Sequence, residues 1–203
     1  MEQSAVPSRR DTPASLPHAE PLIKQFVEHW GLMARAWGIN ATMGELFALL
    51  YITGSDWTAE DLRHWLGVSR GNVSMNLREL LSWGVVHKVH RAGERRELFR
   101  AEIDVWTLFR KILSERKRRE LDPSLHVLDR ASKLAQDHPD LQDIKIRIES
   151  LRRFFKSIDA LAVHLLSLPT ADLVEISQLM PEPDQVAESG NEGASSGTEG
   201  LGV

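Results

Sequence analysis

Residues 69–83 separate an apolar face from a face of hydrogen-bonding side chains. Val73, Leu77 and Leu80 recur at helical spacing and define the apolar, inward side. The outward types match DNA base edges, since arginine pairs with guanine, asparagine with adenine and serine with either, while methionine packs on the thymine methyl group. A glycine near the start of the stretch lets the backbone approach a phosphate. We therefore predict a DNA-recognition helix with these contact residues: Arg70, Gly71, Asn72, Ser74, Met75, Asn76 and Arg78.

A second group of basic residues follows Gly84, where the pattern changes from helical to β. Two runs of β-forming residues flank the polar segment 91–96, which predicts a β-hairpin with a charged tip. Arg95 and Arg96 at this tip suit insertion into a minor groove, as the wing of a DNA-binding domain. Phosphate contacts are expected from basic residues on the strands, namely Lys88, Arg91 and Arg100.

Capping residues mark the helices that must position these groups. Thr58 with Asp61 forms a capping box for a short helix that ends at Gly67, and Ser69 caps the recognition helix. Two short helices joined by the turn 67–69 form a helix-turn-helix, and the hairpin after it completes a winged helix.

Further helices are predicted on both sides of this motif. Upstream, an apolar stripe predicts a helix over residues 21–37, and a Thr42–Glu45 capping box predicts the start of the next helix. Downstream, helical spacing resumes at Asp104, and Pro123 and Pro139 are expected near helix starts.

The last predicted helix carries a heptad pattern that is typical of helix–helix pairing. We interpret it as a dimerisation surface, because extra apolar residues widen the stripe beyond the needs of one partner. The alternative is an antiparallel hairpin within one chain, with Leu121, Leu125 and Leu128 opposite the pattern. The predicted dimerisation residues are Leu141, Ile144, Ile148, Leu151, Phe155, Ile158 and Leu165.

The charge of the chain is distributed unevenly. The 203 residues carry a net charge of -4, yet residues 61–120 hold 14 Lys+Arg against 8 Asp+Glu, a net of +6. Residues 181–203 hold five acidic and no basic residues, so the negative charge of this tail is larger than the net charge of the whole chain. Because binding fields act locally, the global charge does not argue against a nucleic-acid partner.

Composition excludes several classes of protein. The chain has no cysteine, which rules out disulfide scaffolds, thiolate zinc sites, iron–sulfur clusters and thiol catalysis. No apolar run approaches the roughly 18 residues of a membrane span, and the amino terminus lacks an apolar signal core, so we expect a cytoplasmic protein without membrane contact. His87 and His90 would lie on opposite faces of a strand, and no catalytic motif is present. We expect no enzyme, no metal and no cofactor.

These patterns predict a mainly α fold, a winged helix-turn-helix with a small β-hairpin wing and long C-terminal dimerisation helices. The expected organisation is a disordered segment 1–20, a winged helix-turn-helix 21–103 and a helical dimerisation region 104–180, followed by a disordered acidic tail 181–203. Helix 21–37 is expected to be shared with the dimer interface.

Three segments resemble the GbsR-type branch of the MarR superfamily of regulators. They are LGVSRGNVSMNLREL at 66–80, AWG at 36–38 and SERKRRELDP at 114–123. The resemblance implies a dimeric winged-helix transcription factor whose terminal helices form the dimer interface. MarR wings typically carry Asp-x-Arg, in which the aspartate braces the arginine that enters the minor groove. Here Glu94 takes the place of the aspartate, so the resemblance assigns the minor-groove role to Arg96.

Tryptophan is unusually frequent, with six residues against one tyrosine. Proteins similar to this branch include regulators that answer to choline-like osmolytes, and tryptophan faces bind quaternary ammonium groups. Trp30, Trp37 and Trp106 are therefore the candidates for an effector pocket. The alternative interpretation is an aromatic stripe that belongs to the core.

The sequence thus predicts a sequence-specific, DNA-binding transcriptional regulator. A homodimer would bind double-stranded DNA at a pseudo-palindromic operator, with helices 69–83 in major grooves and wings 91–96 in minor grooves. A small-molecule effector, unidentified, is a further expected partner. The alternative is a winged-helix module that binds another protein and no DNA.

Overall fold

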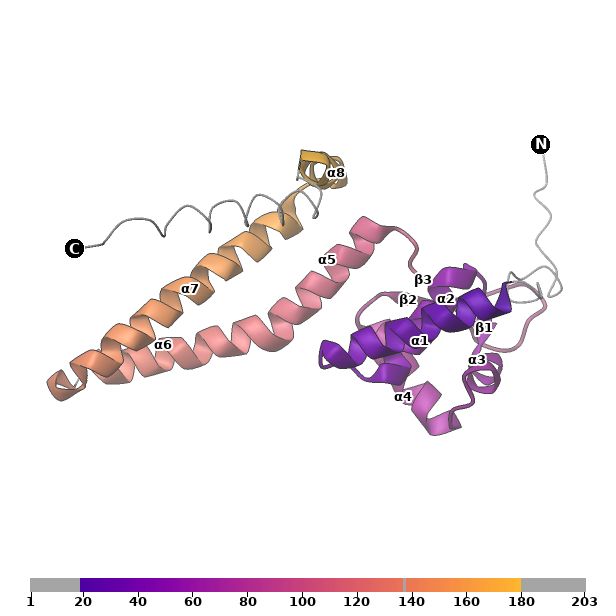
Figure 1. Ribbon diagram of the computed structural model, residues 1–203, viewed down its shortest axis with the longest axis horizontal. Helices are drawn as coiled ribbons and strands as arrows, with labels where there is room; N and C mark the ends of the chain where they lie inside the picture. Colours follow the sequence, from indigo (N-terminus) through magenta and orange to yellow (C-terminus); the bar gives the residue numbers. More distant parts are fainter. Residues whose placement is uncertain (1–18, 137, 180–203) are drawn as a thin grey trace, which may run out of the picture.

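The computed structural model describes residues 19–136 and 138–179. It shows a winged-helix part from which a long helical arm projects (Figure 1). The predicted disordered tail lies outside the described residues, as does most of the predicted N-terminal segment, although Glu20 already begins the first helix. The elements of the winged-helix part are α1 (Glu20–Ala36), α2 (Ala41–Thr53), β1 (Trp57–Thr58), α3 (Ala59–Leu66), α4 (Arg70–Ser82), β2 (Val86–Val89) and β3 (Leu98–Ala101).

Two of the predicted helix starts are confirmed. The Thr58 hydroxyl accepts a hydrogen bond from the Asp61 backbone N–H at 3.1 Å and donates one to the Asp61 carboxylate at 2.6 Å. The Ser69 hydroxyl accepts from the Asn72 N–H at 3.3 Å, so it caps α4. Between them Gly67 adopts a left-handed conformation with φ 66°, which makes the turn of the helix-turn-helix.

The predicted Thr42–Glu45 capping box is wrong. Asn40 caps α2 instead, and its side-chain oxygen accepts from the Thr42 backbone N–H at 2.9 Å. The Thr42 hydroxyl is used elsewhere, because it accepts a hydrogen bond from the Asn72 side chain of α4 at 3.1 Å. The hydroxyl that the local pattern predicted as a helix cap therefore makes a tertiary contact with α4 instead.

The three strands form one antiparallel sheet in the order β1-β3-β2. Val86 pairs with Ala101 and Val89 with Leu98, which confirms the predicted hairpin. The two-residue strand β1 was not predicted from the sequence, because it is too short to show alternation. The centre of the core is formed by α2, the apolar sides of α3 and α4 and the base of the sheet. Its largest fully buried side chains are Leu46, Leu49, Leu50, Leu62, Val73 and Val86.

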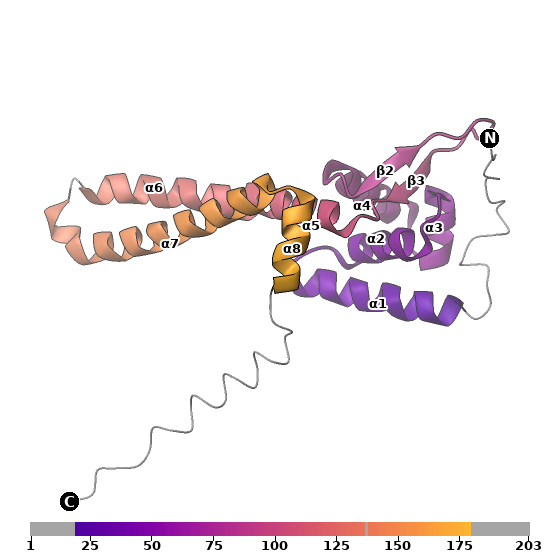
Figure 2. The ribbon, with the colours of Figure 1, turned by 90° about the horizontal axis from the view of Figure 1, so that it is seen from above.

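The arm begins with one nearly continuous helix and returns along itself. α5 (Val105–Arg116) leads through a π-helical turn η2 (Lys117–Leu121) into α6 (Asp122–Gln136), and Pro123 is the second residue of α6. After a 3-10 turn η3 (Pro139–Leu141), α7 (Gln142–Ser167) runs back antiparallel to α6, and α8 (Thr170–Leu179) turns away from it (Figure 2). No single described helix is long and apolar enough to cross a membrane; α7 and α8 meet both conditions only when taken together, and a bend of 118° separates them.

The residues of the heptad pattern lie on two sides of α7, one packed against α6 and one uncovered. Leu141, Ile148 and Phe155 are partly buried on the side where Arg152 reaches Asp129 of α6 at 2.5 Å. Ile144 and Leu151, from the same pattern, are each 48% exposed. α6 and α7 therefore form the hairpin within one chain that the sequence left as the alternative, while alternate residues of the pattern stay uncovered.

Truncation of a core side chain tests the position of α2. Leu46→Ala should lower the free energy of unfolding by about 2–5 kcal/mol, because Leu46 has no exposed surface and its removal leaves a cavity. Chemical denaturation of the variant beside Met75→Ala, an exposed residue of α4, provides the measurement. Equal losses in the two variants would contradict the described core.

Candidate nucleic-acid interface

Some of the predicted DNA-contacting residues line a groove between α4 and the wing. The groove has a volume of about 610 Å³ and an apolar floor that includes Val73, Leu77 and Phe99. Its rim carries five of the predicted contact residues, which come from both elements: Arg70, Ser74 and Arg78 from α4, and Lys88 and Arg96 from the hairpin. The structure thus brings together, in one concave surface, basic groups that are separated in the sequence.

The outer face of α4 is open. Met75 is 59% exposed, and a side chain added at Gly71 would meet no atom within 4 Å. Arg78 is exposed, and its Nε donates to the Ser74 carbonyl at 3.3 Å, which lays the guanidinium along the helix. Among residues 19–136 and 138–179, no hydrogen bond or ion pair joins Met75 or Arg78 to another element, so both side chains are accessible to a ligand that approaches α4.

Asn76 must be removed from the predicted contact residues, because its side chain is 5% exposed. Its amide nitrogen donates to the Asn72 carbonyl at 2.9 Å and to the Asn72 side-chain oxygen at 2.6 Å. Asn72 is only partly exposed, and its own amide nitrogen donates to Thr42 of α2. The two asparagines, four residues apart on one side of α4, form a polar bridge to α2, and a buried amide requires such partners.

The tip of the wing is held by Glu94. One carboxylate oxygen accepts from the Arg96 backbone N–H at 3.1 Å and from Nε at 3.0 Å, and the other meets Nη2 at 2.7 Å. Hydrogen bonds from Arg96 lower the pKa of Glu94 to about 2. Glu94 therefore contacts Arg96 through both carboxylate oxygens and holds its guanidinium in place. Arg95, beside it, is exposed.

Carboxylates also engage the other basic residues of the wing. The Asp56 side chain, 1% exposed, meets Arg100 of β3 at 2.5 Å and Arg91, in the loop after β2, at 2.6 Å. It therefore ties β3 and this loop to the segment before β1. Lys88 of β2 pairs at 2.6 Å with Glu97, which lies just before β3. Contacts with phosphates were predicted for these cations, but the sequence did not reveal their acidic partners, because Asp56 lies 44 residues before Arg100.

A second cavity, of about 450 Å³, lies between α1, α2, the end of α4 and α5. Two of the three predicted pocket tryptophans, Trp30 and Trp37, line it. Trp106 does not line it and instead meets Phe109 edge-on, with ring centroids 6.2 Å apart. The reason is helical phase, since Val105, Leu108 and Ile112 are the α5 residues that face the cavity. Trp83 also lines the cavity and was not singled out from the sequence.

Within the described ranges, no group of three or more histidine, aspartate or glutamate side chains could hold a metal ion.

The Glu94–Arg96 contact has a defined pH dependence. Because the pKa of Glu94 is held near 2, its carboxylate should stay charged in the folded protein from pH 6 down to pH 3. The stability that it contributes should be fully present above the ordinary pKa of 4.5 and should be lost progressively as the pH falls from 4.5 to about 2, because the unfolded chain takes up its proton first. In Arg96→Ala the carboxyl should titrate within that range, near the ordinary 4.5. Carboxyl chemical shifts followed by NMR measure both, and titration of Glu94 near 4.5 in the parent protein would contradict the contact.

Comparison with known proteins gives partial sequence matches and a shared fold. No family model matches the chain. It is 32% identical over 83 residues to the HTH-type transcriptional regulator MmpR5 of Mycobacterium tuberculosis, covering 40% of this chain and 50% of that protein. The Bacillus subtilis HTH-type transcriptional repressor OpcR is 27% identical over 93 residues, covering 45% and 48%, and the Bacillus subtilis protein YvaV is 27% identical over 89 residues, covering 44% and 50%. The chain therefore spans about half the length of the curated relatives it matches.

The solved structure of a transcriptional regulator superposes with a TM-score of 0.58 at 22% identity, covering 72% of this chain and 96% of that one. None of the relatives bears the name of an enzyme. The chain is thus similar in sequence to HTH-type transcriptional regulators, and its mainly α fold with a small antiparallel sheet is a winged helix-turn-helix.

Proposed function

We propose that the chain is a sequence-specific DNA-binding transcriptional regulator of the MarR superfamily, in its GbsR-type branch. The observation that carries the proposal is the groove between α4 and the wing, whose rim presents Arg70, Arg78, Lys88 and Arg96 from two separate elements. With α4 in a major groove and the wing in the adjacent minor groove, this concavity would receive the phosphate backbone that separates the two grooves, and cations on both of its sides suit that strand. The similarity to HTH-type regulators supports the same function.

Each part of the surface has a distinct task in this proposal. Arg70, Ser74 and Met75, on the open face of α4, read base edges in the major groove, and Arg78 contacts a base or a phosphate. Asn72 holds α4 on α2 and contributes less to reading than its type suggests. Arg96, oriented by Glu94, enters the adjacent minor groove.

The operator is proposed to be pseudo-palindromic and the protein a homodimer. The uncovered side of α7 offers an apolar surface for a second copy, which includes Ile144, Leu151, Phe154, Ile158 and Leu161. Side chains this large, lying side by side on one helix face, favour a partner over water. A dimer would place its two α4 helices in successive major grooves, about 34 Å apart.

The apolar cavity beside α1 is proposed to bind a small effector. Its aromatic lining, with Trp30, Trp37 and Trp83, suits a quaternary ammonium compound such as choline or betaine, which aromatic faces attract. The cavity borders α4 through Leu80 and Trp83, so an occupant would touch the recognition helix.

The alternative, a winged-helix module for protein binding, is less well supported. Protein binding of this kind favours an apolar face on the recognition helix. On α4, by contrast, Met75 is the one large hydrophobic residue whose side chain is exposed. A gel shift with the DNA upstream of the protein's own gene, at two salt concentrations, separates the two functions.

Arg96→Ala should weaken operator binding and reduce the salt dependence of binding by about one phosphate-equivalent, because one cation in the groove is lost. Fluorescence anisotropy across a salt series gives the slope for the parent protein and the variant. Arg147→Ala, an exposed arginine of α7, is the matched control and should leave the slope unchanged. Equal slopes for parent and Arg96→Ala would remove the wing from the interface.

Leu151→Lys should shift the protein from dimer to monomer, because it places a charge in the proposed interface between two chains. Sedimentation velocity measures the shift. Ala160→Lys makes the matched control, since Ala160 is exposed on the same helix beside Arg153 and Lys156. A parent protein that sediments as a monomer would contradict the proposed assembly.

Titration with choline or betaine should change the intrinsic tryptophan fluorescence in a saturable manner. Trp30→Leu should remove most of the change, whereas Trp106→Leu should keep it, since Trp106 lies outside the cavity. Fluorescence that stays constant during both titrations would contradict the proposed ligand class.

A further inference from the structure

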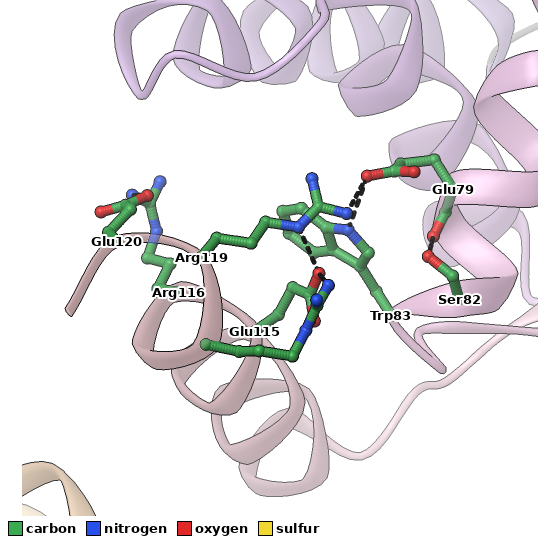
Figure 3. Close-up of polar contacts among 8 residues, drawn as sticks. Glu79, Ser82, Trp83, Glu115, Arg116, Arg119 and Glu120 are labelled. Carbon is green, nitrogen blue, oxygen red and sulfur yellow. Dashed lines mark hydrogen bonds and ion pairs between the residues drawn. The ribbon is translucent and has the colours of Figure 1, made fainter. Parts of the chain in front are cut away.

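Arg119, in the π-helical turn of the arm, reaches across to the recognition helix. Its Nη2 donates to the Glu79 carboxylate of α4, and its Nε donates to the Glu115 carboxylate of α5. Figure 3 shows the guanidinium between these two carboxylates, with the Trp83 indole beneath it. One side chain thus connects two elements that are 40 residues apart in the sequence.

Trp83 gives this connection a second, independent contact. The Arg119 guanidinium carbon lies 5.2 Å from the centroid of the indole ring, within the range of a cation–π interaction. The indole Nε1 donates to the same Glu79 carboxylate at 3.2 Å. Glu79 and Trp83 lie one helical turn apart at the end of α4. The Glu79 carboxylate binds the edge of the planar guanidinium and the Trp83 ring packs on its face, and together these contacts fix its orientation.

The π-helical turn is anchored to the rest of the arm on its other side. Lys117 pairs with Asp122 at 2.5 Å and with Asp159 of α7 at 2.8 Å. Before the turn, Arg116 donates at 3.3 Å to the carbonyl of Trp37, which follows the end of α1. Two residues of the turn thus make charged contacts in opposite directions, Lys117 to α7 and Arg119 to α4.

Neighbouring charges on the same turn do not make this connection. Arg118 pairs with Glu115 at 2.5 Å, within its own helix, and its side chain is 65% exposed. Arg119 and Arg118 thus share a charge, a turn and the partner Glu115, yet Arg119 alone of the two also contacts α4 in the described residues.

We infer that Arg119 is a positioning residue for DNA binding, which fixes the angle between the recognition helix and the arm. Partly exposed ion pairs contribute little to stability, so the value of this contact lies in orientation. Because the arm carries the proposed dimer surface, this angle sets the distance and rotation between the two α4 helices of a dimer. The inference rests on the proposed function for its biological consequence, whereas the angle itself can be measured without DNA.

The first experiment measures the angle directly. The chain contains no cysteine, so Ser74→Cys on α4 and Arg130→Cys on α6 create a unique pair for spin labels. Pulsed electron resonance on labelled protein, diluted into unlabelled protein, gives the distance distribution within one chain. A narrow distribution in the parent should become broader in Arg119→Gln and stay narrow in Arg118→Gln. Equal widths in the parent and Arg119→Gln overturn the inference.

The second experiment measures the consequence for operator choice. Adding or removing one base pair between half-sites rotates one half-site by about 35° relative to the other, which a rigid dimer tolerates poorly. Arg119→Gln should reduce the discrimination between the best spacing and its neighbours by about fivefold, the size expected for one charged contact at the surface. Arg119→Lys, which keeps the charge but not the planar contact, should restore part of it.

The outcomes separate the two proposals. A parent protein that binds no operator contradicts the proposed function, while the distance measurement still decides the role of Arg119. A parent with a sharp spacing preference that Arg119→Gln keeps unchanged overturns the inference alone. Melting temperatures check folding, and if Arg119→Gln does not fold, Glu79→Gln tests the same contact from α4.

Discussion

The packing of α4 on α2 determines which surface the protein can offer to DNA. Val73, Leu77 and Leu80 are buried against the core, so the helix has a single orientation about its axis. The bridge from Asn76 through Asn72 to Thr42 reinforces that orientation with hydrogen bonds, which require correct geometry in a way that apolar contact does not. The groove depends on this contact, because a rotation of α4 about its axis would turn the residues proposed to read DNA toward the core and expose the buried ones.

The surface that meets DNA in the proposed function is built from opposing charges. Glu94, Glu97 and Asp56 each engage a basic residue of the wing, so the arginines and lysine are held in place before any ligand arrives. A phosphate must compete with these carboxylates, which reduces the attraction to DNA of any sequence. Cations that are oriented but partly neutralised bind well only where a minor groove meets them in the right geometry, and they bind other polyanions less. Such selectivity suits a protein whose net charge is -4.

Local signals in the sequence predicted most of the fold. The Thr58 and Ser69 caps, the glycine turns and the change to β periodicity after Gly84 each depend on neighbours within a few residues, and the structure has them as expected. The errors arose where a distant partner decided the outcome. Thr42 did not cap its helix because α4 uses its hydroxyl. Asn76 is buried with its amide nitrogen donating to Asn72, whose own side chain is held by Thr42 of α2. The heptad pattern could not assign its own partner, since α6 and a second chain present the same apolar chemistry.

The π-helical turn at Lys117–Leu121 also constrains how the chain can change in length. It holds a wider turn inside an otherwise regular helix, and each α-helical residue rotates the chain by about 100° about the axis. Five residues in this wider winding rotate the chain by about as much as four α-helical residues, so deletion of one residue there would restore regular winding and leave α6 and α7 near their present orientation. A second deletion would have no such reserve, and it would turn the uncovered face of α7 by about 100° relative to α4. The five-residue turn can therefore lose one residue without changing the arm geometry, whereas a longer deletion would give a related chain a different arm on the same winged helix.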